Sequence, residues 1–89
     1  MKIDFTVKFE KQYLGLPKQI KAKAEKQENL FRNNPFHPSL HTEKLAPRLK
    51  EIWSFRLDIK YRVLFRFLEK DKVLFLYVGP HDQIYKIKF

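Results

Sequence analysis

The strongest constraint on the fold lies in the second half of the chain, where large apolar residues alternate with polar ones. The alternation runs through residues 49–59 and again through residues 61–68, and a period of two is typical of β-strands with one buried face. A charged segment at residues 69–72 leads into residues 73–78, which are almost entirely apolar, as in a strand buried on both sides. Because strands joined by short turns pair antiparallel, we expect these segments to form an antiparallel sheet.

The first half of the chain combines one alternating segment with helical spacing. Residues 2–9 alternate and predict a further strand, and residues 10–14 predict a short helical turn that ends at Gly15. A longer helix is expected to begin at Pro17, because proline lacks the N–H that the first turn of a helix leaves unpaired. Five residues recur at helical spacing along this helix: Leu16, Ile20, Ala24, Gln27 and Phe31.

The remaining segments complete the predicted order of elements. Asn33-Asn34-Pro35 ends the long helix, and residues 34–48 are expected to form a loop, since they hold three of the five prolines. Helices next to such a sheet bury their apolar stripe by covering one of its faces. We therefore predict one α+β domain over residues 1–89, in which two N-terminal helices pack on one face of a small antiparallel sheet and a short C-terminal tail follows.

Charge and cysteine content limit the classes of function. The chain has 19 Lys and Arg against 10 Asp and Glu, which gives a net charge of +9. Such a field attracts polyanions, so nucleic acid or an acidic protein segment is the expected partner, with a merely soluble basic surface as the alternative. The absence of cysteine excludes disulfides, thiolate catalysis and cysteine-bound zinc.

Neither a signal peptide nor a membrane span is expected. The N-terminal sequence MKIDFTVKF alternates and carries charges, whereas a signal peptide contains a continuous apolar region. No segment approaches the roughly 18 apolar residues that cross a bilayer. We expect a cytoplasmic protein without a membrane partner.

Three arginines share one face of the predicted sheet. By strand parity, Arg56 on one strand and Arg62 and Arg66 on the next project from the face opposite the aromatic side chains, with Lys8 and Thr6 of the first strand as candidates to join them. This face is expected to be exposed. Arginine holds phosphate through forked, charge-assisted hydrogen bonds, so the cluster favours phosphate binding, although exposed strand positions also carry polar residues for no other reason than solubility.

His81 is the one histidine whose position suggests catalysis. It follows the break after the last long strand, with Asp82 beside it and Tyr85 four residues further on. Histidine titrates near neutral pH and can serve as a general acid or base, while the alternative is a loop histidine without a catalytic role.

The sequence predicts neither a metal site nor a cofactor. His37 and His41 have the spacing of a metal-binding pair on a helix, but Pro38 between them opposes a helix there. A glycine-rich phosphate loop, a Ser-His-Asp set and paired carboxylates are likewise missing from the sequence. The remaining possibilities are metal-free chemistry on a phosphodiester, or binding alone.

Three stretches between residues 34 and 85 point to a known family. NPFHPSL, KLAPRLKEIWSFRLDIKYRVLF and LFLYVGPHDQIY follow one another in this order. In order and spacing they resemble the RelE/ParE toxins of bacterial and archaeal type II toxin–antitoxin pairs. The resemblance implies an antiparallel sheet with helices on one face and an active face on the other. For the RelE-like branch it implies ribosome-dependent mRNA cleavage, in which the ribose 2′-OH attacks the adjacent phosphate without metal or cofactor.

The resemblance also implies roles for individual residues. Arg62, in YRVLF, matches an arginine that stabilises charge on the phosphate. His81 matches the acid of histidine-using members, and Tyr85 matches an aromatic residue that aids proton transfer or stacks on a base. Four further cations are candidate RNA-binding residues: Arg56, Lys50, Arg66 and Lys44.

The general base has no certain match in the family pattern. RelE has lysines on the strand that corresponds to residues 53–58 of this chain. This chain has Trp53 and Phe55 there instead, which is more similar to YoeB-like toxins. The candidates for the base are Glu51 and Glu43.

The family implies partners and an alternative function. A co-transcribed antitoxin with an acidic, partly disordered tail is expected, besides mRNA and the ribosome. The ParE-like branch shares the fold but inhibits DNA gyrase without nuclease residues, and a decayed toxin that only binds its antitoxin is a third possibility. The ending HDQIY favours the ribonuclease branch.

Overall fold

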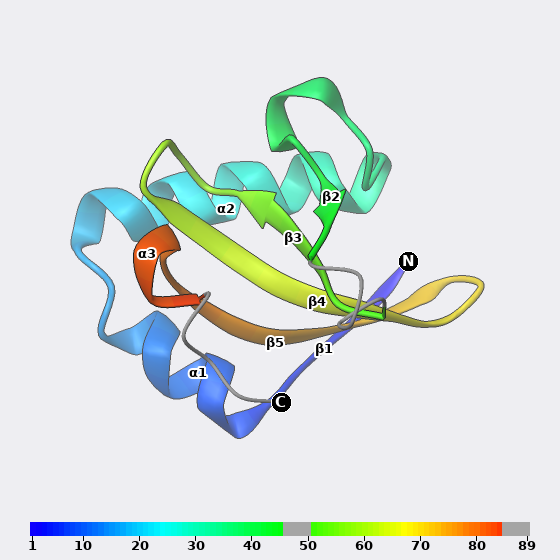
Figure 1. Cartoon of the computed structure of the whole chain (residues 1–89), viewed down its shortest axis with the longest axis horizontal. Coiled ribbons are helices and arrows are strands. Elements are labelled where there is room, and N and C mark those ends of the chain that lie inside the picture. Colours follow the sequence, from blue (N-terminus) through cyan, green and yellow to red (C-terminus); the bar gives the residue numbers. More distant parts are fainter. Residues whose placement is uncertain (46–50, 85–89) are drawn as a thin grey trace.

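A computed structural model of the chain describes residues 1–45 and 51–84 (Figure 1). Lys50 and Tyr85, two of the candidate site residues, lie outside these ranges. The elements, in chain order, are β1 (Lys2–Phe5), α1 (Val7–Leu14), α2 (Lys18–Asn33), the 3₁₀ turn η1 (Pro38–Leu40), β2 (Glu43–Lys44), β3 (Trp53–Arg56), β4 (Tyr61–Glu69), β5 (Lys72–Pro80) and α3 (His81–Ile84).

The strands form one five-stranded sheet in the order β1-β5-β4-β3-β2. β1 runs parallel to β5, and every other neighbouring pair is antiparallel. The predicted α+β class and the hairpins formed by β3, β4 and β5 are therefore confirmed. The parallel pair arises because the chain passes through both N-terminal helices and the other strands before β5 returns beside β1.

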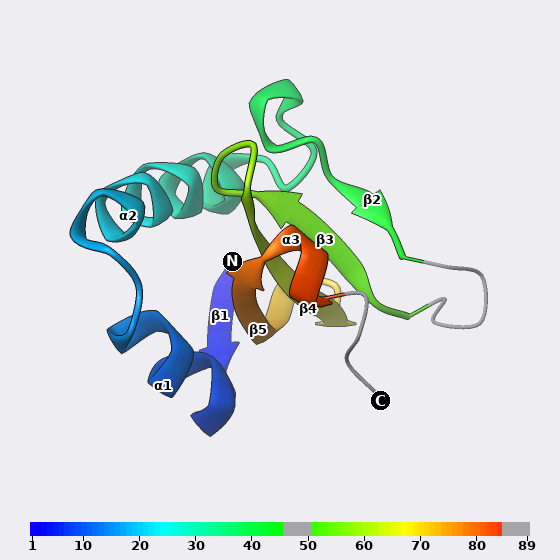
Figure 2. The same ribbon diagram turned by 60° about the vertical axis from the view of Figure 1, so that its left-hand side comes forward.

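Both N-terminal helices lie on the same side of the sheet, as Figure 2 shows. The core between them and the sheet is aromatic: Phe31 of α2 packs on Phe55, Phe65 and Phe75 of three strands, with ring centroids 4.9 to 5.4 Å apart. All four rings are at most 2% exposed. Rings of this size bury much apolar area per residue, which a domain of 89 residues requires for a stable core.

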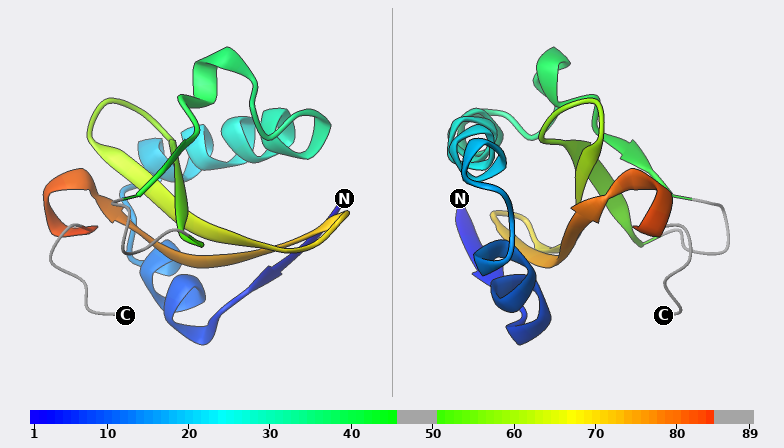
Figure 3. Two further views of the ribbon diagram at one scale, coloured as in Figure 1. Left: turned by 45° about the vertical axis from the view of Figure 1, so that its right-hand side comes forward. Right: turned by 90° about the vertical axis from the view of Figure 1, so that its left-hand side faces the viewer.

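The opposite side of the sheet carries a second, smaller core, where a short C-terminal tail was expected. The first four residues after β5 instead form α3, which lies across the sheet from α1 and α2 in the right-hand view of Figure 3. Ile84 of α3 packs with Leu64 of β4 and with Ile52 and Leu45. The face predicted to be exposed is therefore partly covered, because Leu64, between the arginines of β4, is fully buried.

The prediction of a strand over residues 2–9 is wrong beyond Phe5. Thr6 caps the N-terminus of α1: its hydroxyl accepts a hydrogen bond from the Phe9 backbone N–H at 3.0 Å and donates one to the Leu76 carbonyl at 2.9 Å. A threonine cap satisfies a backbone donor that the first helical turn leaves unpaired, so the chain turns into a helix despite its alternation. Val7, expected in the core, is 69% exposed.

The strand predicted over residues 49–59 is also shorter than expected, since β3 spans only Trp53–Arg56. Residues 57–60 form the turn to β4, where Ile59 is 86% exposed instead of buried. The loop predicted over residues 34–48 contains η1 and the two-residue strand β2 within its described part. No helix among the described residues is long and apolar enough to cross a membrane.

Candidate functional site on the arginine face

The register of the sheet brings the predicted arginines to one face. Arg56 of β3 is directly opposite Arg62 of β4, and Arg66 follows four residues later on β4. We call this face, opposite α1 and α2, the arginine face. Directly opposed residues of an antiparallel pair have their Cβ atoms about 4.5–5.5 Å apart, so the register brings the Cβ atoms of Arg56 and Arg62 close together on this face.

Arg62 is buried, with only 9% of its surface exposed, contrary to the expectation of an exposed arginine. Its Nη1 donates hydrogen bonds to the carbonyl oxygens of Asp58, Ile59 and Tyr61, at 2.7, 2.8 and 3.2 Å. The guanidinium therefore closes the turn between β3 and β4. Since three main-chain acceptors depend on it, Arg62 supports the structure as well as contributing charge to the face.

Asp58 organises the same turn from the other direction. Its Oδ1 accepts hydrogen bonds from the backbone N–H groups of Lys60 and Tyr61 at 2.9 and 2.8 Å, and its Oδ2 lies 3.4 Å from the Lys23 ammonium of α2. Burial on its own raises the pKa of Asp58, but the Tyr61 and Lys60 hydrogen bonds and Lys23 outweigh it and lower the pKa below its usual value of 3.8. The carboxylate stays ionised and keeps the turn closed at neutral pH.

Gln27 of α2 connects the helix to the strand that carries Arg56. Its buried amide nitrogen donates to the Arg56 carbonyl at 2.9 Å and to the Ser39 carbonyl at 3.3 Å. Helical spacing correctly placed Gln27 on the inner stripe of the helix. The contact shows why a polar residue lies there, since a buried carbonyl needs a donor.

Arg66 forms an ion pair with Glu51, whose carboxylate oxygen lies 2.8 Å from Nη2. Both side chains are considerably exposed, at 41% and 69%, so solvent screens the pair. The Nε of Arg66 is buried and has no hydrogen-bond partner among the described residues. Glu43, the other candidate base, is opposite Ser54 in the register and is exposed. The structure thus places Glu51, but not Glu43, in contact with an arginine of the face.

His81 lies at the same end of the sheet as the Arg56–Arg62 pair. It is the first residue of α3, and its backbone N–H donates to the Lys60 carbonyl at 2.6 Å, within the turn that Arg62 closes. Gly79, two residues earlier, is directly opposite Arg62. The His81 side chain is exposed, so the structure brings this histidine near the arginine pair in an accessible position.

Tyr77 belongs to this face although the sequence analysis did not select it. A β-bulge at Leu76 shifts the register, so that Phe75 is opposite Phe65 in the core while Tyr77 is opposite Leu64 on the arginine face. Strict alternation would put Phe75 and Tyr77 on the same face. The sequence analysis instead treated residues 73–78 as buried on both sides, so no pattern singled out the tyrosine.

The surroundings of Tyr77 explain two further residues. Its ring lies over Gly79, where a Cβ would come within 3.0 Å of the ring, so a side chain at position 79 would displace the tyrosine. The Lys8 ammonium lies 5.5 Å from the centre of the same ring, within the range of a cation–π contact. Lys8 therefore does approach the arginine face, from helix α1 and not from the expected strand.

Lys44 is on the other side of the sheet. It is directly opposite Trp53, and its ammonium lies 5.4 Å from the Trp53 ring, which packs on the helix-facing core. The structure thus separates Lys44 from Arg56, Arg62 and Arg66. Lys50 and Tyr85 fall outside the described residues, so their proposed roles stay predictions.

The described residues contain no group of three or more histidine, aspartate or glutamate side chains that could hold a metal ion. His37 and His41 were considered above as a metal-binding pair. The Nδ1 of His37 accepts a hydrogen bond from the Ser39 backbone N–H at 3.1 Å. His41 ends the 3₁₀ turn in a left-handed conformation. Both therefore shape the loop after α2, as expected for structural residues.

Sequence comparison matches residues 12–81 to a family model described as a RelE-like toxin of the type II toxin–antitoxin system HigB. The match covers the end of α1, all of α2, and β3, β4 and β5, which form the arginine face. Comparison with individual curated proteins gives no significant match.

Solved structures share the fold at low sequence identity. A YoeB/ParE toxin from Agrobacterium tumefaciens has a TM-score of 0.76 at 18% identity, covering 91% of this chain and 99% of its own. YafQ from E. coli has a TM-score of 0.77 at 16% identity, covering 94% and 97%. The toxin in a RelB-RelE antitoxin–toxin complex from Methanococcus jannaschii gives 0.74 at 18% identity, covering 93% and 95%.

Proposed function

This chain belongs to the HigB family of RelE-like toxins of type II toxin–antitoxin systems, and from that premise we propose that it is an endoribonuclease that cleaves mRNA on the ribosome. The proposal extends to a cytoplasmic location, a single domain over residues 1–89 and neutralisation by a cognate antitoxin. Structures of related folds in complex with antitoxins, such as RelB-RelE and YoeB-YefM, support the last point.

The observation that carries the proposal is the directly opposed pair of Arg56 and Arg62, with His81 at the same end of the sheet. Two guanidinium groups on neighbouring strands suit the oxygens of a phosphodiester, which gain negative charge as the phosphorane forms. Because Arg62 is fixed by three carbonyls and Asp58 fixes the turn, this site is largely preorganised before RNA binds. Preorganised charge stabilises a transition state without further reorganisation.

The proposed reaction is an internal transfer within the RNA. A general base removes the proton from the ribose 2′-OH, the oxygen attacks the adjacent phosphorus, and the bond to the 5′-oxygen of the next nucleotide breaks. This leaves a 2′,3′-cyclic phosphate, and the departing 5′-oxygen takes a proton from an acid. We assign the acid to His81 and charge stabilisation to Arg62 with Arg56. Of the two candidates for the base, Glu51 contacts Arg66 on this face. Arg66 lies four residues from Arg62 along β4, about 13 Å in an extended strand, so the contact does not place Glu51 at the Arg56–Arg62 pair, and we leave the base unassigned.

Tyr77 is added as a surface for a nucleotide base. Its ring lies on the arginine face beside Arg62, with Lys8 close to it. Aromatic rings stack on bases regardless of sequence, and a nearby ammonium attracts the phosphates that flank them. Tyr85 keeps its predicted role of supporting proton transfer or stacking.

Single-turnover cleavage on ribosomes programmed with a defined mRNA tests the proposal. We expect codon-positioned cuts in translated mRNA, and no direct effect of a chelator on the chemical step. Expression in cells should stop translation. If growth stops while transcripts stay intact, the nuclease assignment is wrong, and supercoiling by purified gyrase with and without the chain then tests the ParE-like alternative.

A further inference from the structure

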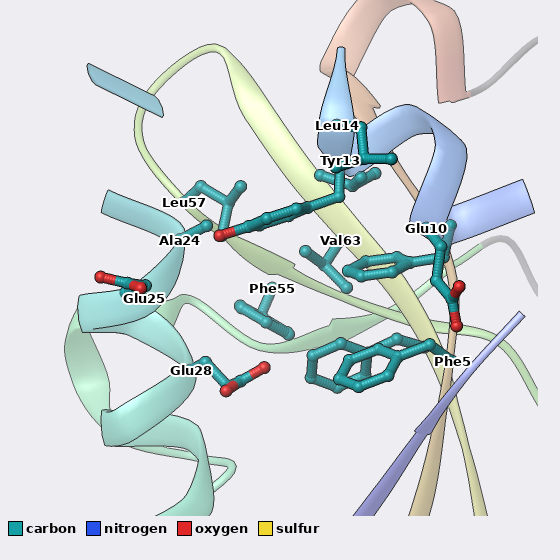
Figure 4. Close-up of a pocket in the computed structure, with 13 residues that line it drawn as sticks. Phe5, Glu10, Tyr13, Leu14, Ala24, Glu25, Glu28, Phe55, Leu57 and Val63 are labelled. Atoms are coloured by element: carbon teal, nitrogen blue, oxygen red, sulfur yellow. The ribbon is translucent and has the colours of Figure 1, made fainter. Parts of the chain in front are cut away.

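An apolar groove of about 380 Å³ opens between α1 and α2, on the side of the sheet opposite the arginine face. Its floor consists of apolar side chains from β3, β4 and β5 and from the turn between β3 and β4, namely Phe55, Val63, Phe75, Val78 and Leu57. Figure 4 shows the Tyr13 ring extending from α1 toward Ala24 of α2, with Leu14 beside it. The volume of the groove is within the range of ligand-binding pockets, roughly 300–1,000 Å³.

The walls of the groove leave large apolar side chains exposed to solvent. Leu14 is 73% exposed and Phe5 is 39% exposed, and both line the groove. Phe5 stacks on Phe9 at 5.3 Å, and Phe9 on Tyr13 at 6.2 Å, so the α1 side presents a continuous row of rings. Exposed apolar side chains along a groove are suited to contact the apolar side chains of a bound segment.

The rim of the groove has the opposite charge to the rest of the protein. Glu25 and Glu28 line it on α2, and Glu10 lines it on α1. Glu10 and Glu25 form no ion pair with a described residue, and Glu28 only an exposed one with Arg32. Burial raises the pKa of Tyr13, and the charges of Glu25 and Glu28 raise it further, as expected where the local potential is negative.

We infer that this groove is a docking site for an amphipathic segment of a partner protein that carries lysine or arginine beside its apolar residues. Apolar anchors would fill the groove, and the flanking cations would pair with the glutamates on both helices. A rim of three carboxylates repels a polyanion, so RNA is not the occupant. The identification of this partner as the antitoxin rests on the proposed function. The binding of an amphipathic, basic segment in the groove does not depend on the proposed function.

The position of the groove has a consequence for neutralisation. Since the groove and the arginine face lie on opposite faces of the sheet, a segment bound in the groove leaves Arg56 and Arg62 uncovered. An antitoxin that binds in the groove and also covers the arginine face would do so with two separate segments, a basic one for the groove and an acidic one for the arginines.

The test uses the full chain and a synthetic amphipathic helix of about 18 residues, close to five helical turns, with leucines at helical spacing flanked by lysines. A second peptide carries glutamates in place of the lysines. Binding is measured by fluorescence anisotropy and located by NMR shifts. We expect the lysine peptide to bind at least about tenfold more tightly, to shift Leu14 and Ala24, and to weaken as salt is raised.

The matched variants are the triple neutralisation Glu10→Gln, Glu25→Gln and Glu28→Gln, and the control Glu69→Gln, an exposed residue at the end of β4 outside the groove. The triple variant should bind the lysine peptide about tenfold more weakly, and the control as tightly as the native chain. Circular dichroism confirms folding.

Several outcomes would overturn the inference. These are equal binding of the two peptides, shifts confined to the arginine face, or a concentration-dependent dimer of the chain that uses the groove. A neutral apolar dye that enters the groove while neither peptide binds would assign it to a small ligand instead. Failure of the cleavage assay with selective binding of the lysine peptide would contradict the proposed function but not this site.

Discussion

The two faces of the sheet differ in how their side chains are satisfied. On the helix-facing side, Phe31, Phe65 and Phe75 are buried against one another and need only close packing. On the arginine face, Arg62 is also buried, at 9% exposed, but its guanidinium is satisfied by main-chain carbonyls, while the side chains of Arg66 and His81 remain accessible. The comparison shows that a residue of the functional face can also support the fold, so burial alone does not separate stability from function.

The largest effect is expected from the helix-facing core. Phe31→Ala should lower the free energy of unfolding by about 3–5 kcal/mol, because it removes a fully buried ring that contacts three others and leaves a cavity. Urea denaturation measures this loss. The exposed Ile59→Ala serves as the control, with a change within about 0.5 kcal/mol. Equal losses for the two variants would contradict the described core.

Arg62→Ala tests the residue that combines both roles. Cleavage should fall by roughly 10²–10³ through lost charge stabilisation. The free energy of unfolding should also fall, by about 1–3 kcal/mol, because three carbonyls lose their donor. Single-turnover cleavage and urea denaturation on the same preparation separate the two effects. If the variant is as stable as the native chain, the role of Arg62 in closing the turn is wrong.

His81→Ala should affect function without stability. As the proposed acid, its loss should slow cleavage by roughly 10²-fold, whereas the free energy of unfolding should change by less than about 1 kcal/mol because the side chain is exposed. The pH dependence of the cleavage rate provides the check, since the limb that reports the acid should disappear in the variant. Unaltered cleavage in a folded His81→Ala, Arg56→Ala double variant would move the active site away from this end of the sheet.

Asp58 should make the turn between β3 and β4 sensitive to acid. Its pKa in the folded chain is lowered below the usual 3.8, so its ionised form stabilises the fold above that pH, and this contribution is lost as the pH falls through the lowered pKa. Asp58→Asn should therefore be less stable than the native chain at neutral pH, and the difference should shrink below pH 3.8. Urea denaturation over this range measures it, and a constant difference would argue against the assignment.

The smallest effect is expected from Arg66→Ala. Its ion pair with Glu51 is largely exposed, so the unfolding free energy should change by less than about 1 kcal/mol. Cleavage should fall less than for Arg62→Ala, since Arg66 lies further from His81 along β4. The same pair of assays applies. A loss of cleavage as large as that of Arg62→Ala would shift the phosphate site toward Glu51.

The sequence by itself determined the class of fold and the residues that share a face. A period of two placed β4 closely, a continuous apolar run placed most of β5, and helical spacing placed α2 together with the inward direction of Gln27. Strand parity also put Arg56 and Arg62 on one face, and the register set by the short turn makes them direct neighbours. These features depend on the local spacing of apolar and polar residues, which is visible in each segment of the sequence.

Only the tertiary structure decided the points at which local patterns compete. Thr6 ended an alternating segment by capping a helix, and the bulge at Leu76 moved Tyr77 to the arginine face. The burial of Arg62 depends on carbonyls that converge only when the turn closes, and the groove between α1 and α2 depends on how far apart two helices pack. These features arise from contacts between distant segments, so no single stretch of the sequence encodes them.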